Sequence, residues 1–303
     1  MQNKISIGFA SGKRGIGKTS ILLSFYKYIC NNSIFADTNI DATDTFLLLE
    51  KTMHSNEPFF SGLKYYIDQD ICVRCGKCLS GCRFGAIKRT GKFAIDLNKC
   101  EGCGACVDLC VASAIYNEEN YCGDLYISET IFDSVMVYAR QKPGKDNSDK
   151  LIQKVKDTVC QMAGSLNKEF IVIDCPPGIG RPLMAGISGL NLLVIIYDGS
   201  REDLNDNEKL IEAASKLKVP VVVVINKIGI NKADKNMTGI HTDIDTEIMT
   251  SLDSQGIILA GIIPYDEEVN SLLNNNKLMI DSSNSKFVDN IKAIFDNILT
   301  VIK

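Results

Sequence analysis

The sequence predicts an α/β protein with a mostly parallel sheet, helices on both faces of that sheet, and a small inserted domain. Apolar runs of strand length alternate with helical patterns over most of the 303 residues. A glycine-rich loop follows the first apolar run. Eight of the 12 cysteines fall between positions 72 and 110, where the alternation stops. Together these observations predict a layered domain that a cysteine-rich domain interrupts.

Five apolar runs are expected to form buried strands, namely 4–10, 33–37, 170–174, 192–198 and 221–226. Their near-continuous hydrophobicity is typical of a parallel sheet that is covered on both faces. Helical patterns lie between them at 18–30 and at about 148–164, 203–217 and 242–255. Such alternation predicts right-handed crossover connections.

The composition is that of an ordinary globular protein, with 45% hydrophobic and 23% charged residues and a formal net charge of -4. This charge gives no indication of nucleic-acid binding. The longest apolar runs, 192–197 and 219–225, are too short to span a bilayer, and the N-terminus lacks the pattern of a signal peptide. We therefore expect a cytoplasmic protein without membrane attachment, in which cysteines serve metal binding or catalysis rather than disulfides.

The cysteine-rich segment contains an internal repeat. The stretches CVRCGKCLSGCRFGAI (72–87) and CEGCGACVDLCVASAI (100–115) align without gaps at a period of 28 residues. Each half is too small to bury a core, so something other than apolar burial must stabilise it. We expect an inserted domain at 67–116, between the two parts, 1–66 and 117–303, of a discontinuous α/β domain.

The cysteine spacing predicts two 4Fe–4S clusters. The pattern C-x2-C-x2-C-x3-C occurs twice, and it is the spacing of bacterial two-cluster ferredoxins, in which the fourth cysteine of each run ligates the other cluster. Two zinc sites are the alternative, but zinc usually takes its ligands from paired C-x2-C turns. The expected ligand sets are Cys72, Cys75, Cys78 and Cys110 for one cluster, and Cys100, Cys103, Cys106 and Cys82 for the other.

The glycine-rich loop predicts a nucleotide phosphate site. Its sequence GKRGIGKT (12–19) fits the pattern G-x-x-x-x-G-K-[ST] between a strand and a helix. Backbone N–H groups of such a loop surround phosphate oxygens, the lysine adds positive charge, and the threonine hydroxyl suits Mg²⁺. The expected nucleotide contacts in this loop are Gly12, Lys13, Gly15, Ile16, Gly17, Lys18, Thr19 and Ser20.

The stretch SGKRGIGKTS (11–20) resembles the deviant Walker A loop of the MinD/ParA family of P-loop ATPases, which includes the nitrogenase iron protein. The resemblance implies that Lys13 acts catalytically beside Lys18 by reaching across a dimer to the partner's nucleotide, as an arginine finger does. Arg14 departs from the family pattern, which usually has a second glycine there. The sequence assigns no role to Arg14.

Two further segments resemble the magnesium and water loops of that family. In ADTNIDATD (36–44), Asp37 stands at a magnesium position, and Asn39 stands where the family usually has a water-orienting aspartate. An amide cannot take a proton, so we expect slow hydrolysis unless Asp41 or Asp44 substitutes. In VIDCPPGIG (172–180), Asp174 resembles the Walker B residue and joins Thr19 and Asp37 around Mg²⁺.

Two later segments resemble the loops that hold adenine. These are VINK (224–227) and GIIPYDEE (261–268), from which we expect contacts by Asn226, Lys227 and Pro264. The stretch NKIG lacks the aspartate of the guanine-reading N-K-x-D motif, which favours ATP over GTP. With five motifs in the family's order, the resemblance covers nearly the whole chain.

The combination resembles the MinD-like ATPases with an inserted ferredoxin domain, which are found mainly in anaerobes. It implies ATP-gated electron transfer to a protein acceptor, by a nucleotide-dependent homodimer or a heterodimer with a related ATPase. The alternative is a carrier or maturation factor that delivers Fe–S or other metalloclusters to an apoprotein client. Positioning on a membrane or on DNA would leave the cysteines unexplained.

The remaining cysteines are expected to be structural. Cys30 and Cys160 lie on helical patterns and are expected to be buried, and the same structural role is expected for Cys122 and Cys175. The nitrogenase iron protein has a cluster-binding cysteine seven residues after its switch aspartate, where this chain has Arg181. A guanidinium cannot ligate iron, so no cluster shared between subunits is expected there. The amphipathic segment 287–303 is expected to dock on the domain as a helix.

Overall fold

The computed structural model describes residues 4–41, 45–144, 147–198, 201–228, 249–275 and 277–302. The chain divides into two compact units. The first comprises Met1–Glu57 with Asp124–Lys303, and the second comprises Pro58–Gly123. The cysteine-rich segment 67–116 lies within the second unit.

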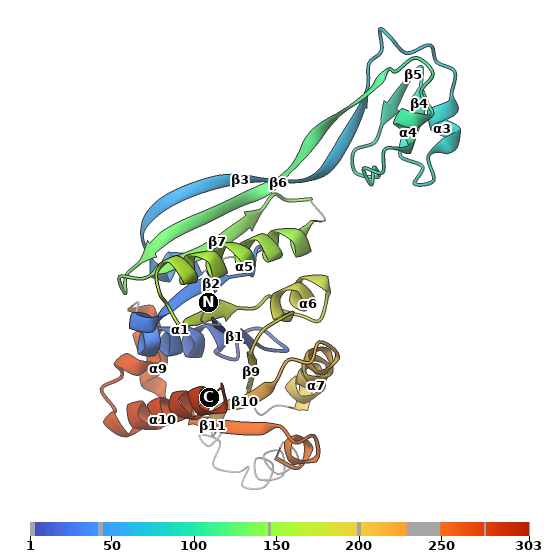
Figure 1. Ribbon diagram of the computed structural model, residues 1–303. Coiled ribbons are helices and arrows are strands. Elements are labelled where there is room, and N and C mark those ends of the chain that lie inside the picture. Colours follow the sequence, from blue (N-terminus) through green and yellow to red (C-terminus); the bar gives the residue numbers. More distant parts are fainter. Residues whose placement is uncertain are drawn as a thin grey trace. The chain divides into compact units, whose positions relative to one another are not determined.

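A nine-stranded sheet organises the described chain, in the strand order β11-β10-β9-β1-β8-β2-β7-β6-β3 (Figure 1). Strands β1, β2, β8, β9 and β10 confirm the five predicted runs, and they pair in parallel with one another in the order β10-β9-β1-β8-β2. The strands are β1 (Ile5–Ala10), β2 (Ser33–Asp37), β3 (Glu50–Ile67), β6 (Ile115–Thr130), β7 (Val135–Gln141), β8 (Phe170–Asp174), β9 (Leu192–Tyr197), β10 (Val221–Ile228) and β11 (Ile258–Pro264).

Helices cover both faces of the parallel part of this sheet, as the sequence predicts (Figure 1). Helix α5 packs against β2, β7 and β8, and α7 packs against β9, whereas α1 and α10 pack together on the opposite face. Of the predicted helix at about 242–255, residues 249–254 are helical, and the first half lies outside the described residues. The helices of this unit are α1 (Lys18–Ile29), α2 (Thr45–Leu49), α5 (Ser148–Ser165), α6 (Arg181–Ile187), α7 (Arg201–Lys216), α9 (Glu267–Asn274) and α10 (Ser285–Ile302), with short 3₁₀ turns η1 (Cys30–Asn32) and η3 (Met279–Asp281).

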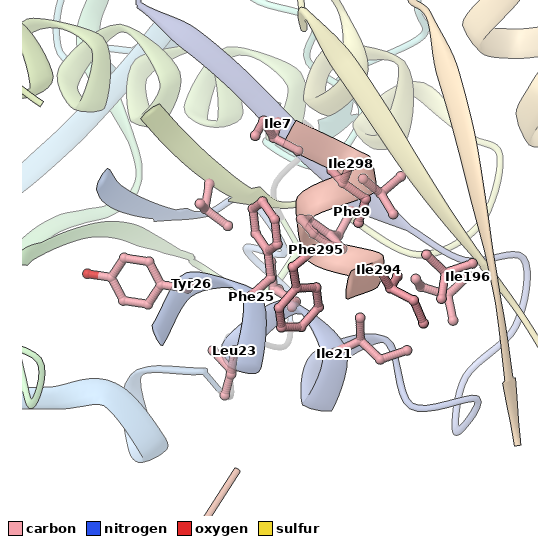
Figure 2. Packing of buried hydrophobic residues seen from close by; sticks show 14 of the residues in the cluster. Ile7, Phe9, Ile21, Leu23, Phe25, Tyr26, Ile196, Ile294, Phe295 and Ile298 are labelled. Carbon is pink, nitrogen blue, oxygen red and sulfur yellow. The ribbon is translucent and has the colours of Figure 1, made fainter. Parts of the chain in front are cut away.

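The main hydrophobic core joins α1 and α10 to the sheet (Figure 2). The ring of Phe25 on α1 lies 5.3 Å from Phe9 on β1 and 5.2 Å from Phe295 on α10, measured between ring centroids. Ile294 and Ile298 on α10 are also buried. The predicted docking of the C-terminal helix on the domain is therefore confirmed, because its apolar stripe fills this core.

Helix α5 corrects one prediction. Its buried stripe consists of Leu151, Ile152, Val155, Val159 and Ala163. Cys160 follows Val159 by one residue, about 100° further around the helix, and its side chain is exposed. The prediction that Cys160 is buried is therefore wrong, whereas Cys122 and Cys175 are buried and Cys30 is half-buried.

The second unit repeats its backbone as well as its sequence. It contains α3 (Lys77–Gly81), β4 (Ile87–Thr90), β5 (Lys92–Ile95) and α4 (Ala105–Asp108), together with the adjoining parts of β3 and β6. Gly76 and Gly104 precede α3 and α4 in the same left-handed conformation, with φ of 79° and 78°. The positions 74 and 102 share positive φ, and so do 85 and 113. The 28-residue period is therefore a structural repeat.

The two halves of this repeat interlock through backbone hydrogen bonds. The N–H of Asp68, before the first cysteine run, donates to the carbonyl of Ala114, after the second run, at 2.8 Å. The equivalent N–H of Asp96 donates to the carbonyl of Ala86 at 2.7 Å. The start of each half is thus held against the end of the other, which brings cysteines of both halves together.

None of the helices in the described ranges is long and apolar enough to cross a membrane.

The α10 interface gives a stability prediction. Phe295→Ala should lower the free energy of unfolding of the first unit by about 3–5 kcal/mol, because the lost ring leaves a cavity between α10 and Phe25. Urea unfolding followed by helical circular dichroism measures the change. Val301→Ala is the matched control on the same helix, since Val301 is 37% exposed, and it should cost well under 1 kcal/mol. Similar losses for both variants would contradict the assigned packing.

Candidate functional site

The carboxyl ends of the parallel strands gather the predicted nucleotide residues at one edge of the sheet. A cavity of about 460 Å³ lies there, within the usual range for a small-molecule site. Of the predicted nucleotide and catalytic residues, those that line it are Lys13, Gly15, Gly17, Lys18, Thr19, Ser20, Asn39, Asp174, Asn226, Lys227 and Pro264. Gly12, Ile16, Asp37 and Asp41 are not among the lining residues.

The loop between β1 and α1 has the geometry of an anion-binding turn. Gly15 and Gly17 have φ of 83° and 94°, a conformation that side chains with a Cβ rarely adopt. A Cβ on Gly17 would also lie 2.4 Å from Nδ2 of Asn226. Helix α1 begins directly afterwards at Lys18, and no side chain caps its first turn. The free N–H groups and the helix dipole favour a negatively charged ligand at this point.

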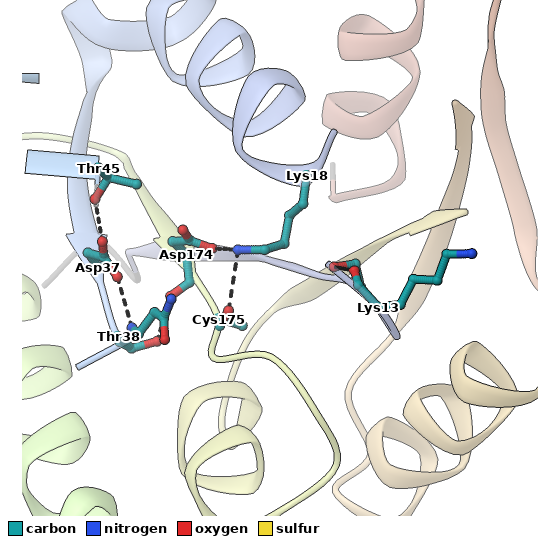
Figure 3. Close-up of polar contacts among 9 residues, drawn as sticks. Lys13, Lys18, Asp37, Thr38, Thr45, Asp174 and Cys175 are labelled. Carbon is teal, nitrogen blue, oxygen red and sulfur yellow. Dashed lines mark hydrogen bonds and ion pairs between the residues drawn. The ribbon is translucent and has the colours of Figure 1, made fainter. Parts of the chain in front are cut away.

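Lys18 connects this loop to the end of β8 (Figure 3). Its ammonium forms an ion pair with Asp174 and donates to the carbonyl of Cys175 at 3.4 Å. Burial lowers the pKa of Lys18, while the nearby Asp37 and Cys175 act in the opposite direction. The charge of Lys18 is therefore held at the floor of the cavity by buried anionic and carbonyl partners.

The carboxylate of Asp37 lies beside Asp174 and is fixed by its neighbours. The register of β2 and β8 pairs these two residues, and both are buried. Asp37 accepts a hydrogen bond from the N–H of Asn39 at 2.8 Å and another from the hydroxyl of Thr45. The Thr38 hydroxyl donates to the carbonyl of Asp174 at 2.6 Å. Two carboxylates are thereby placed at adjacent strand ends, an arrangement that suits a divalent cation.

Of the two aspartates that could replace Asn39, the described one, Asp41, does not line the cavity. Asn39 lines the cavity, whereas Asp41 is solvent-exposed. Asp44 lies outside the described residues. Within the described lining, the position two residues after Asp37 thus offers an amide rather than a carboxylate.

The segment expected to hold the base also supports the phosphate loop. Asn226 is 3% exposed, and its Nδ2 donates to the carbonyl of Ile16 at 2.7 Å. The ammonium of Lys227 donates to the carbonyl of Gly15, also at 2.7 Å. Ile16 does not line the cavity because its side chain is buried. Its backbone carbonyl instead accepts the hydrogen bond from Asn226.

Lys13 lies at the rim of the cavity and extends away from Lys18 (Figure 3). Its ammonium forms an ion pair with Asp198 at 3.0 Å, and the side chains are 34% and 17% exposed. Asp198 directly follows β9. The two loop lysines therefore have different partners, Asp174 in a buried pair and Asp198 in a partly exposed pair.

Two small cavities in the second unit carry the cysteines in two sets of four. One is lined by Cys72, Cys75, Cys78 and Cys110, and the other by Cys82, Cys100, Cys103 and Cys106. Among the described residues, no group of three or more His, Cys, Asp or Glu side chains is arranged to hold a single metal ion. Each set supplies the four thiols that a 4Fe–4S cluster requires.

Backbone N–H groups approach the fourth sulfur of each run. Ala86 donates to Sγ of Cys82 at 3.4 Å, and Ala114 donates to Sγ of Cys110 at 3.3 Å. At Cys82, burial raises the pKa, but N–H groups of residues 84–87 outweigh it and leave the pKa below its usual value. Burial raises the pKa of Cys78 and of Cys106. The same short loop therefore directs a backbone N–H group at the fourth sulfur in both halves, and at Cys82 it favours the thiolate, the ligand form.

Arg181 and Cys175 lie in different surroundings, one exposed and one buried. The guanidinium of Arg181 is exposed and pairs with Asp149 at 3.0 Å. The thiol of Cys175 is fully buried, and burial raises its pKa to about 11. A Cβ added to Gly8 on β1 would lie 3.0 Å from this sulfur, so Cys175 packs against the middle of β1.

Comparison with known proteins places this geometry in a family. A family model described as "4Fe-4S dicluster domain" matches residues 64–111, which contain all eight clustered cysteines. An uncharacterized protein of Methanocaldococcus jannaschii is 31% identical over 297 residues, covering 97% of this chain and 96% of that protein. The chain belongs to the same family as this protein.

The fold of this family member is that of the MinD/ParA P-loop ATPases. The cell division ATPase MinD of Pyrococcus furiosus has a TM-score of 0.57 at 14% identity, covering 99% of this chain and 100% of its own. The septum site-determining protein MinD of Pyrococcus horikoshii, complexed with Mg-ADP, has the same TM-score and identity and covers 99% and 97%.

Several residues at this edge of the sheet were not predicted from the sequence. Thr45, Tyr265 and Met279 line the cavity, and buried Asn207 accepts a hydrogen bond from the N–H of Gly12 at 3.0 Å. The stretch GIIPYDEE contained Tyr265, so adenine-loop resemblance pointed to it. Asn207 lies on the apolar stripe of α7, and an asparagine among apolar positions could have indicated a buried polar contact.

Proposed function

We propose that this protein is an ATP-dependent iron–sulfur protein in which nucleotide state controls electron transfer to a protein partner. The observation that carries the proposal is the pair of four-thiol cavities in a chain that also has a P-loop cavity. Each thiol set combines three cysteines from one half with one from the other, as ferredoxin spacing requires. Two 4Fe–4S clusters bound there would supply one-electron redox chemistry.

ATP is the nucleotide that the first unit suits best. The N–H groups of the loop and Lys18 would hold the phosphates, and Thr19, Asp37 and Asp174 would hold Mg²⁺. The MinD structure from P. horikoshii is complexed with Mg-ADP, which supports the same use of the fold here. Because Asn39 occupies the lining where a carboxylate would orient water, hydrolysis is proposed to be slow.

Lys13 is proposed to act across a nucleotide-dependent dimer. Its place at the cavity rim leaves Lys18 as the lysine that contacts the phosphates within the same chain. Its ion pair with Asp198 is 3.0 Å long and partly exposed, so exchange of that partner for a phosphate oxygen has a modest cost. The dimer is formed either by two copies or with a related ATPase, and the cytoplasm is its proposed location.

Electron transfer explains the described thiols better than cluster delivery does. A carrier needs a labile cluster, often shared between subunits, whereas each cavity here has four thiols from one chain. At the position where a shared cluster would find its cysteine, Arg181 pairs with Asp149 instead. Cluster delivery to an apoprotein remains the alternative function.

Iron analysis of double variants tests the crossed thiol sets. Anaerobically prepared protein should contain about eight irons per chain. Cys75→Ala with Cys110→Ala damages one set and should retain about four irons, whereas Cys75→Ala with Cys82→Ala damages both sets and should retain few. Equal iron content in the two double variants, or stoichiometric zinc with little iron in the unaltered protein, would overturn this assignment.

ATP turnover and column sizing test the division of labour between the lysines. Lys18→Ala should weaken ATP binding on the order of a hundredfold, because it removes the charged phosphate contact. Lys13→Ala should leave ATP binding by the monomer nearly unchanged, but it should abolish turnover and the ATP-dependent shift to a dimer. Circular dichroism checks that Lys18→Ala, which leaves Asp174 unpaired, remains folded. Equal turnover by Lys13→Ala and the unaltered protein would refute the proposed role.

A chelator assay separates electron transfer from cluster delivery. Reduced protein is incubated with an iron chelator and an apo-ferredoxin, with and without Mg·ATP. We expect the iron to remain bound in both cases, since four thiols of one chain surround each cavity. Lys18→Ala is the control for any nucleotide effect. ATP-accelerated appearance of a cluster in the apo-ferredoxin would favour the delivery function.

A further inference from the structure

The two halves of the second unit share one backbone but have opposite charge. Residues 72–99 contain seven lysines and arginines and one aspartate, whereas residues 100–123 contain four acidic residues and neither lysine nor arginine. The matching φ values at positions 74 and 102, 76 and 104, and 85 and 113 show that this backbone does not require either charge. The charge difference between the halves is therefore related to what their surfaces contact, rather than to the backbone fold.

The charge difference is sharpest where each cavity reaches the surface. Cys75 and Cys103 are equivalent in the repeat, and they are the exposed cysteines of their sets. Cys75 lies between Arg74 and Lys77 in the sequence, and Arg74 lines its cavity. The cavity of Cys103 is lined instead by Glu101.

The cations beside Cys75 have no partner of their own in the described chain. Neither Arg74 nor Lys77 forms an ion pair there, whereas Lys88 pairs with Asp96 at 2.8 Å. Arg83 lies over the ring of Phe84, 4.7 Å from its centroid. Arg74 and Lys77 thus present their charge to solvent, and a partner would not have to displace an internal contact to reach them.

Arg74 also occupies a position that favours glycine. Its φ is 57°, and the equivalent Gly102 has a φ of 67°. A side chain in this left-handed region costs roughly 1–2 kcal/mol. Keeping arginine here stores strain beside the exposed thiol, which points to a use for the side chain at the surface.

Exposed apolar side chains adjoin the same thiol set. Val73 is 64% exposed and lines the cavity of Cys75, and Val111, which follows Cys110 of the same cavity, is also 64% exposed. We name Val73, Arg74, Cys75, Lys77 and Val111 the basic face. An apolar centre with a charged margin is the usual composition of a protein–protein interface.

We propose that the basic face is the docking surface for a protein whose own contact surface is acidic. Carboxylates of the partner pair with Arg74 and Lys77, and its apolar centre covers Val73 and Val111. A nucleic acid would offer no complement for the valines. A second copy of this chain, docking by its acidic half, would make a head-to-tail contact that does not close. This proposal rests on the proposed electron transfer only for the reason why a partner docks here.

Binding of a fluorescently labelled acidic bacterial ferredoxin, measured by anisotropy at low salt, tests the proposal. Both proteins are kept oxidised and free of nucleotide, so the result does not depend on electron transfer or ATP turnover. Arg74→Glu with Lys77→Glu should weaken binding at least tenfold. The matched control is Lys92→Glu with Lys99→Glu, two exposed lysines that do not line the cavity of Cys75, which has the same change in net charge and should weaken binding less than threefold.

Further variants and probes separate surface effects from folding and from other partners. Arg74→Gly gives the first half the residue of the second, so it should keep its iron yet bind the ferredoxin several-fold more weakly. Equal losses in the two double variants, or unchanged affinity in Arg74→Gly and the first double variant, would overturn the docking surface. So would tighter binding of polyuridylate than of ferredoxin, or self-association in sedimentation that the first double variant abolishes. Docking with no subsequent electron exchange would leave this surface intact and refute the electron-transfer function instead.

Discussion

The buried ion pair between Lys18 and Asp174 is the contact on which the nucleotide edge depends. It joins the first residue of α1 to the last residue of β8, and therefore ties the phosphate loop to the centre of the sheet. Removing either partner would leave an unpaired charge in a buried setting, which is strongly unfavourable. The neighbouring carboxylate of Asp37 is oriented by Thr45 and by the Asn39 N–H, so the charged groups of this edge form one connected arrangement.

A second layer of contacts keeps the phosphate loop in shape from the other side. Asn226 and Lys227, on β10, donate to carbonyls of the loop, and Asn207, on α7, accepts from its first glycine. These bonds connect the strand end proposed to hold the base to the loop proposed to hold the phosphates. A ligand that displaces the end of β10 would therefore displace the phosphate loop as well, through short, direct hydrogen bonds rather than through the core.

The sequence alone was sufficient for those parts of the protein in which residue type and spacing determine geometry. Continuous apolar runs predicted β1, β2, β8, β9 and β10, and the cysteine spacing predicted the same two thiol sets that line the cavities. It was insufficient where tertiary contacts between distant segments decide. Asp198, Asn207 and Thr45 acquire their roles only when strand order brings them to the loop, and no spacing links them to it. Cys160 was misjudged because a helical period was recognised without locating which face of α5 is buried.

The interlocked hydrogen bonds of Asp68 with Ala114 and of Asp96 with Ala86 have a consequence for how such a unit is assembled. Each half supplies three thiols to one cavity and a single thiol to the other, so one half alone completes neither. Two identical halves would complete both, which makes a symmetric pair of short separate chains the smallest self-sufficient form of this architecture. Joining such a pair into one polypeptide removes the requirement for identity. Each half is then free to acquire its own surface, and the two ends of the unit are no longer equivalent.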